Sequence, residues 1–405
     1  MATIPVASRT LLGRLQCARE QTDKLFDLMR PEALYSRPVA ERHRLIFYLG
    51  HLEAFDWNLV CRKTLSASSF HPQFDQLFEF GIDPPVGKAA EDQPSDWPGV
   101  AEVRTYNRRV RDAVDERLEQ VPEQIAHVAL EHRLMHAETL AYLLHNLPYE
   151  EKQQDQRLLH SGHRIASPMI WIPPGQATLG QESGEFGWDN EFARHSVSVP
   201  AFAIGKHKVT NGQYLEYVRD GAPPPHFWAE RGGEWFYRGM FAEVPLPLNA
   251  PVYVTHAEAT AYARWSGKQL PTEAQFHRAA YGTPNGDERS YPWGSAPPDA
   301  SRGNFDFHNW DPVDVDATPA GESAFGVSQL VGNGWEWTVT QFGPFAGFQP
   351  FPFYPGYSQN FFDEEHYVLK GGSARTAACL LRRSFRNWFR PNYPYVYASF
   401  RLVEN

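Results

Sequence analysis

Residues 121–147 read VPEQIAHVALEHRLMHAETLAYLLHNL and have the apolar spacing of an amphipathic helix. Pro122 suits the first turn of that helix, where a missing backbone N–H costs nothing. Steps of three and four residues place one stripe of side chains on a single helix face: Ile125, Ala129, His132, His136, Thr139 and Leu143. We therefore predict a long helix whose stripe faces the interior of a helical bundle.

Three further segments before residue 165 predict helices of similar length. Apolar residues recur at helical spacing over residues 8–29, 38–65 and 100–119. Residues 70–98 are rich in proline and irregular, which predicts a long loop of the kind that often serves a site. Four such helices favour an up-and-down bundle, because a helical array would need an internal repeat and none is found.

The composition changes near residue 165, where glycine, proline and aromatic residues begin to separate short runs. Three of these runs predict strands: residues 167–180, 195–210 and 366–373. Short helices are predicted over residues 256–266 and 272–280, the second with Thr272 and Gln275 in a capping-box pattern. The sequence thus predicts an α+β protein with two domains, residues 1–165 and residues 166–405.

Aromatic residues are concentrated near the end of the chain. Residues 341–400 contain 17 Phe, Tyr or Trp. This density is about twice that of the whole chain, and it fits an aromatic core and an aromatic-walled ligand cleft equally well.

The overall composition argues against several classes of protein. Lys and Arg number 38 and Asp and Glu number 48, and the resulting net charge of −10 argues against binding to nucleic acid or to an anionic membrane. No apolar run is long enough for a membrane span and no leader is recognised, so we expect a soluble, cytoplasmic protein. The three cysteines are too few and too scattered for a disulfide scaffold.

Two histidines of the helix over residues 121–147 point to a metal. His132 and His136 stand at positions i and i+4, about 6 Å apart, so both rings can reach one ion. His51, next to Gly50 in the second predicted helix, completes a possible three-histidine site. Neutral imidazoles suit zinc, iron or copper. Satisfied core histidines are the alternative, and Glu138 is a candidate hydrogen-bond acceptor for a ligand N–H.

These histidines and six later motifs together resemble one enzyme family. The motifs are FGWDNEFARHSVSVPAFAIGKHKVTNGQYLEYV (186–218), GKQLPTEAQFHRAA (267–280), LVGNGWEWT (330–338), VLKGGS (368–373), RRSFRNW (382–388) and SFRLV (399–403). Nearly the whole chain resembles the sulfoxide synthases of ergothioneine biosynthesis, the EgtB-type enzymes. That resemblance implies a DinB-like four-helix bundle followed by an irregular domain of the C-type-lectin-like, formylglycine-generating-enzyme-like kind.

The resemblance also implies an activity and its residues. His51, His132 and His136 would bind Fe(II) in a non-haem, O2-dependent oxidoreductase that joins a thiol, cysteine or γ-glutamylcysteine, to C2 of hercynine. Tyr354 and Tyr357 match a catalytic Tyr-x-x-Tyr-Ser, of which the first tyrosine would donate a proton. Asn387 and Trp388 would line the imidazole-substrate site.

The sequence departs from this family at the substrate contacts. By the same resemblance, enzymes that use γ-glutamylcysteine have a charged Asp and a charged Arg at two positions where this sequence has Phe389 and Tyr393. Met135 occupies the position at which a glutamine of the family contacts the imidazole substrate. We therefore expect a smaller thiol, cysteine being the first choice, with Arg386 or Arg390 as the partner of its carboxylate.

Four functions remain open on the sequence. They are the sulfoxide synthase, a related three-histidine iron oxygenase with another thiol or histidine derivative, a formylglycine-generating oxidase, and a non-catalytic lectin-like module or zinc-dependent thiol transferase. The oxidase would need a cysteine pair, yet Cys379 is the only cysteine after residue 61.

Overall fold

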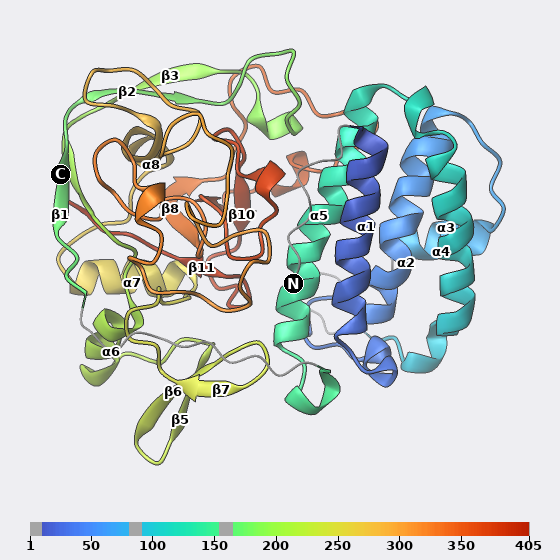
Figure 1. Ribbon diagram of the computed structural model, residues 1–405, viewed down its shortest axis with the longest axis horizontal. Coiled ribbons are helices and arrows are strands. Elements are labelled where there is room, and N and C mark those ends of the chain that lie inside the picture. Colours follow the sequence, from blue (N-terminus) through green and yellow to red (C-terminus); the bar gives the residue numbers. More distant parts are fainter. Residues whose placement is uncertain (1–9, 81–90, 154–164, 405) are drawn as a thin grey trace. The chain divides into compact units, whose positions relative to one another are not determined.

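The computed structural model describes residues 10–80, 91–153 and 165–404, and the chain divides into two compact units, residues 2–156 and 157–405 (Figure 1). The first unit is built from helices, and the named strands all belong to the second. The expected α+β class is therefore confirmed.

A helical bundle forms the first unit, as expected. Its long helices are α1 (Leu11–Asp27), α2 (Leu45–Asp56), α4 (Val100–Asp115) and α5 (Glu123–His145). Helix α1 packs along α5, and α2 packs along α4 (Figure 1). Helix α2 continues as a π-helical segment, Trp57–Thr64.

The second helix begins later than its apolar spacing predicts. The expected start near Pro38 is wrong, because residues 38–44 are not helical. The guanidinium groups of Arg37 and Arg44 both donate to the carboxylate of Asp92, and Arg44 also donates to the Tyr35 carbonyl at 2.7 Å. These bonds hold the segment before α2 in an irregular path.

A further helix, α3 (Pro72–Phe80), lies inside the segment predicted to be a loop. Its apolar residues Phe74 and Phe78 stand at i and i+4, and Phe78 is 0% exposed. A Cβ atom at Gly50 would lie 2.5 Å from the Phe78 ring, so α3 packs closely on α2 at that glycine. Packing of this face outweighs the flanking prolines, while residues 81–90 of the expected loop lie outside the described residues.

The second unit is made of short strands and short helices. Its main sheet has the order β10-β9-β8-β11 and consists of β8 (Trp335–Gln341), β9 (Tyr367–Lys370), β10 (Asn387–Phe389) and β11 (Ala398–Ser399). A second sheet, ordered β1-β4-β12, consists of β1 (Met169–Ile172), β4 (Phe202–Gly205) and β12 (Val403–Glu404). The remaining strands are β2 (Gly175–Leu179), β3 (His195–Val199), β5 (Trp228–Arg231), β6 (Glu234–Arg238) and β7 (Glu243–Pro245).

Three helices accompany these strands: α6 (Asn211–Arg219), α7 (His256–Trp265) and α8 (Glu273–Tyr281). Helix α8 begins with the predicted capping box, in which Gln275 N donates to Thr272 Oγ1 at 3.1 Å and Thr272 N donates to Gln275 Oε1 at 2.9 Å. The core of the unit joins Phe276 of α8 to residues of β1, β2 and β4, among them Ile172, Ala177 and Phe202.

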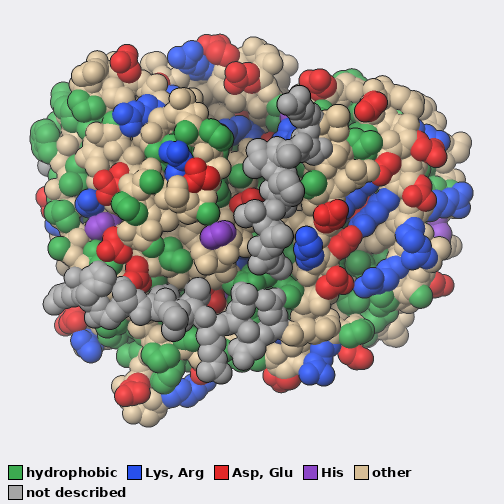
Figure 2. Space-filling view, in the orientation of Figure 1, with side chains coloured by type: hydrophobic (Ala, Val, Ile, Leu, Met, Phe, Trp, Pro, Cys, Tyr) green, Lys and Arg blue, Asp and Glu red, His purple; other side chains and the backbone are tan. Residues whose placement is uncertain are grey.

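The charged side chains of the bundle are mixed on the visible face. Figure 2 shows acidic and basic groups interspersed over the helical unit there. Within the described part of the chain, no helix is both long enough and apolar enough to cross a membrane.

Candidate functional site

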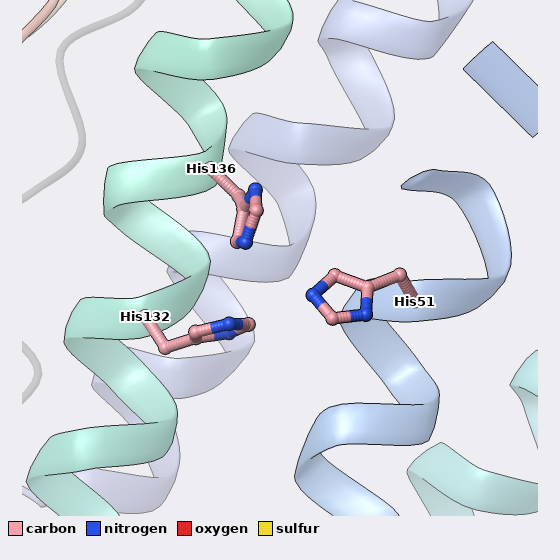
Figure 3. Close-up of side chains that lie close together, drawn as sticks. All are labelled: His51, His132 and His136. Carbon is pink, nitrogen blue, oxygen red and sulfur yellow. The ribbon is translucent and has the colours of Figure 1, made fainter. Parts of the chain in front are cut away.

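The structure brings His51, His132 and His136 together inside the helical unit. His51 comes from α2 and the other two come from successive turns of α5, with the three rings turned toward one another (Figure 3). One ligand atom from each ring lies within 4.8 Å of the others. No other group of three or more His, Cys, Asp or Glu side chains with this spacing occurs within the described ranges.

The His51 ring is oriented by helix α3. Its Nδ1 lies 2.6 Å from the backbone carbonyl oxygen of Phe78, which can only accept a hydrogen bond. The proton therefore resides on Nδ1, and Nε2 is left with a lone pair for a metal. Phe47 stacks on the His51 ring at a centroid distance of 4.8 Å, and Phe55 stacks on the His132 ring at 3.4 Å. Packing thus restrains both imidazoles.

Burial keeps the pair on α5 uncharged. His51 and His132 are 7% and 2% exposed, and His136 is partly buried. Burial first, and then the charges of the neighbouring histidines and arginines, hold the pKa values of His132 and His136 well below the usual range. Neutral imidazoles with converging nitrogens are the donor set that zinc, iron and copper accept, so these residues fit a bound metal ion.

The depressed pKa values predict that the metal-free protein loses stability in acid. The unfolded chain protonates its histidines near pH 6.5, whereas the folded chain keeps His132 and His136 neutral. Stability is therefore fully present above about pH 6.5 and falls as the pH drops below it, by up to ~2 kcal/mol at pH 5 for each imidazole that stays neutral. Urea unfolding of the metal-free protein at pH 7 and pH 5 measures this loss. A smaller loss is expected for H132A/H136A, and an equal loss in both proteins would contradict the assignment.

A second group of candidate residues meets in the other unit. The Tyr357 ring stacks on Trp188 at a centroid distance of 3.9 Å and meets Trp388 edge-on at 5.4 Å. Tyr354 lies 6.4 Å from Trp188 and 5.7 Å from Tyr357. Burial and the charge of Asp189 raise the pKa of Tyr354 to about 12, so its phenol keeps its proton at neutral pH.

The two candidate arginines have different surroundings. Arg386 is buried, donates to Glu273 Oε1 at 3.1 Å and to the Gly343 carbonyl at 3.0 Å, and is therefore committed to internal partners. Arg390 is 41% exposed and pairs with Glu365 at 3.0 Å. Of the two, Arg390 is the one that a solute can reach.

Two of the remaining candidates, Trp388 and Phe389, lie on opposite faces of strand β10. Trp388 stacks on Phe342 at 4.1 Å, whereas its neighbour Phe389 stacks on Tyr393 at 5.3 Å, since successive side chains of a strand point to opposite faces. Asn387 Oδ1 accepts from the Trp388 backbone N–H at 2.9 Å. Met135 lies on α5 beside His136 and is partly buried.

Phe78 and Trp188 take part in these two groups, although neither residue was expected there from the sequence. Phe78 supplies the carbonyl that orients His51, and its i, i+4 spacing with Phe74 is the signal that would have predicted α3. Trp188 joins Tyr354 to Tyr357, and nothing in its local sequence marks that role.

Comparison with known proteins covers the whole chain. Residues 14–153 match the family model of the DinB superfamily, and residues 156–405 match the sulfatase-modifying factor enzyme 1-like domain. The chain is 34% identical to the "Hercynine oxygenase" of Mycolicibacterium thermoresistibile, covering 100% of this chain and 96% of the relative. It is 31% identical to the "Hercynine oxygenase" of Mycolicibacterium smegmatis, over 98% of this chain and 99% of the relative. The "Ergothioneine biosynthesis protein 1" of Neurospora crassa is 28% identical, over 93% of this chain and 56% of the relative.

Proposed function

The chain belongs to the hercynine oxygenase family, and we propose that it is an iron(II)- and O2-dependent sulfoxide synthase that joins a thiol to C2 of hercynine in ergothioneine biosynthesis. The observation that carries this proposal is the cluster of three converging imidazoles on α2 and α5. It belongs to the unit that matches the DinB superfamily.

The donor set supports iron as the cofactor. Fe(II) held by His51, His132 and His136 would supply redox chemistry toward O2 together with open coordination positions for the substrates. The overall reaction balances: thiol, hercynine and O2 give the sulfoxide conjugate and water. Formation of the C–S bond releases two electrons and oxygenation of the sulfur releases two more, which together reduce one O2.

The tyrosines supply the proton chemistry in this proposal. The Tyr354 Oη–H, whose pKa is about 12, remains protonated at neutral pH and serves as the proton donor to oxygen while the C–S bond forms. Tyr357 stacks on Trp188 and also contacts the rings of Tyr354 and Trp388, so it helps to hold these aromatic side chains in place. Asn387 and Trp388 bind the imidazole substrate.

The surroundings of Phe389 support a small thiol. Two stacked rings, Phe389 and Tyr393, offer no charge to a γ-glutamyl group. Arg390 is the accessible guanidinium of the two candidates, so we assign it to the thiol carboxylate, where it would exchange its ion pair with Glu365. The proposed donor is therefore cysteine.

A substrate screen tests the function directly. Protein loaded with Fe(II) without oxygen is mixed with O2, one of hercynine or histidine, and one of cysteine or γ-glutamylcysteine, and O2 consumption and products are measured. We expect the sulfoxide conjugate from hercynine and cysteine, with kcat/KM for cysteine at least about tenfold above that for γ-glutamylcysteine, the equivalent of ~1.4 kcal/mol for one lost charged contact.

Two other results would change the proposal. A preference for γ-glutamylcysteine in the screen would overturn the thiol assignment alone. No O2 consumption for any pair, together with tight zinc binding in a separate metal titration, would instead favour a thiol transferase.

A further inference from the structure

A buried ion pair joins the two helices that carry the histidines. Arg133 follows His132 on α5, and Glu53 stands two residues after His51 on α2, each with its side chain 1% exposed. Arg133 Nη2 donates to Glu53 Oε2 at 2.8 Å and to the Leu52 carbonyl at 2.9 Å. The same nitrogen donates to Asp56 Oδ2 at 2.8 Å, so one guanidinium contacts a stretch of just over one turn of α2.

The other two long helices reach the same carboxylate. Arg111 of α4 donates to Glu53 Oε1 at 2.6 Å from Nη2, and its two terminal nitrogens also donate to Asp23 of α1 at 2.7 Å. Arg19 of α1 lies 3.9 Å from Glu53. Glu53 is thus the centre of a charge network that touches all four long helices.

Stability alone does not account for this network. Taking ions out of water carries a large desolvation penalty, and replacing a buried ion pair by apolar residues of similar volume is often neutral or stabilising. What such a pair does impose is one geometry, because its hydrogen bonds are satisfied in a single register of the helices.

The register of α2 on α5 is what the three histidines require. A slip of one residue along a helix moves a side chain by about 1.5 Å and turns it by about 100°. Metal–nitrogen distances tolerate only about 0.2 Å. The distance between His132 and His136 is set by helix α5 alone. His51 lies on α2, so its ring reaches the other two only if α2 has the correct axial position against α5.

We propose that Arg133 and Glu53 are positioning residues of the metal site, which set the register of α2 against α5 so that His51 meets His132 and His136. This inference rests on the proposed metal site. It assigns to two buried residues outside the ligand set a role in metal affinity and coordination geometry.

Metal binding by the otherwise intact chain tests the proposal. In R133M/E53M both charges of the pair are replaced by apolar side chains of similar length. Arg19, whose Nη2 lies 4.0 Å from Asp56 Oδ2, remains as the cation beside that buried carboxylate, so the metal-free protein is expected to fold. Titration with Co(II), followed by its visible absorption, should give an affinity about 10- to 100-fold weaker than that of the native chain, with a changed band shape. A merely structural pair would change the melting temperature of the metal-free protein and leave the affinity and spectrum of the folded chain unchanged.

Two further variants, D23N and R133K, serve as the control and as a second test of the proposal. D23N removes the outer partner of Arg111 without touching the contact between α2 and α5, so native Co(II) affinity is expected. R133K keeps the charge but loses the two-nitrogen contact to Glu53, in which Nη1 donates to Oε1 at 3.2 Å and Nη2 donates to Oε2 at 2.8 Å, so an intermediate affinity is expected. If R133M/E53M does not fold, R133K is the variant that tests the proposal. Native affinity and spectrum in R133M/E53M, or in a folded R133K when the double variant is unfolded, would overturn the proposal. Absence of Co(II) binding by the native chain would contradict the metal site itself.

Discussion

H136A is expected to lose bound iron and to turn over at least about 10³-fold more slowly than the native chain, a loss of ~4 kcal/mol. Two imidazoles remain after the substitution, and they supply neither the affinity nor the facial geometry of three. Because His136 is only partly buried and its imidazole is neutral, the metal-free variant should unfold within about 1 kcal/mol of the native chain. Iron content after anaerobic loading and urea unfolding of the metal-free protein measure the two effects separately.

H132A should behave in the same way, since His132 is the other half of the pair on α5. His127 provides the matched control, because it lies on the same helix and outside the cluster. H127A is expected to keep its iron and its activity. Full iron content and full activity in H136A would remove the cluster from consideration as the metal site.

Y354F is expected to change the product rather than to stop oxygen consumption. Phenylalanine keeps the ring and its contacts with Trp188 and Tyr357 but removes the phenolic proton. Without that proton, we expect both atoms of O2 to be transferred to the sulfur. The thiol is then converted to its sulfinic acid, and hercynine is not incorporated into the product. Formation of the sulfoxide conjugate should fall by about 10²- to 10⁴-fold, the range for loss of a general acid.

Product analysis by mass spectrometry, with O2 consumption measured in parallel, checks this expectation. Y357F is the control, because it keeps the stack on Trp188 and removes only the second hydroxyl. The native product ratio is expected for Y357F. An unchanged ratio and rate in Y354F would place the proton donor elsewhere, and diversion in Y357F alone would transfer the role to Tyr357.

The sequence was sufficient to predict those features that depend only on residues close to one another along the chain. The i, i+4 spacing placed His132 and His136 on one face of a helix, and Thr272 with Gln275 marked the start of α8. Such features follow from the period of the backbone hydrogen bonds, which is the same in every helix. The motif order along residues 186–403 was sufficient for the family as well.

The sequence was not sufficient where packing opposed the local signal. Prolines and irregular spacing predicted a loop over residues 70–98, yet Phe78 fills the space left at Gly50 and makes α3 a helix that orients His51. Arg386 and Arg390 look equivalent in the sequence, but Arg386 pairs with Glu273 inside the core, whereas Arg390 pairs with Glu365 at the surface and stays accessible.

The sequence by itself determined that long helices occur in the first unit, that His132 and His136 share one helix face, and which family the chain belongs to. The first two depend on residue types at short, regular spacings, and the third depends on the order of motifs along the chain. The sequence named His51 as a possible third ligand, and the tertiary structure brought its ring to the pair. Tertiary structure alone decided that Arg133 and Glu53 link α2 to α5 and that Trp188 contacts both tyrosines. Each of these contacts joins segments far apart in the chain. A hydrogen bond or a ring stack forms only within a few ångströms, and only the packed fold brings such segments that close.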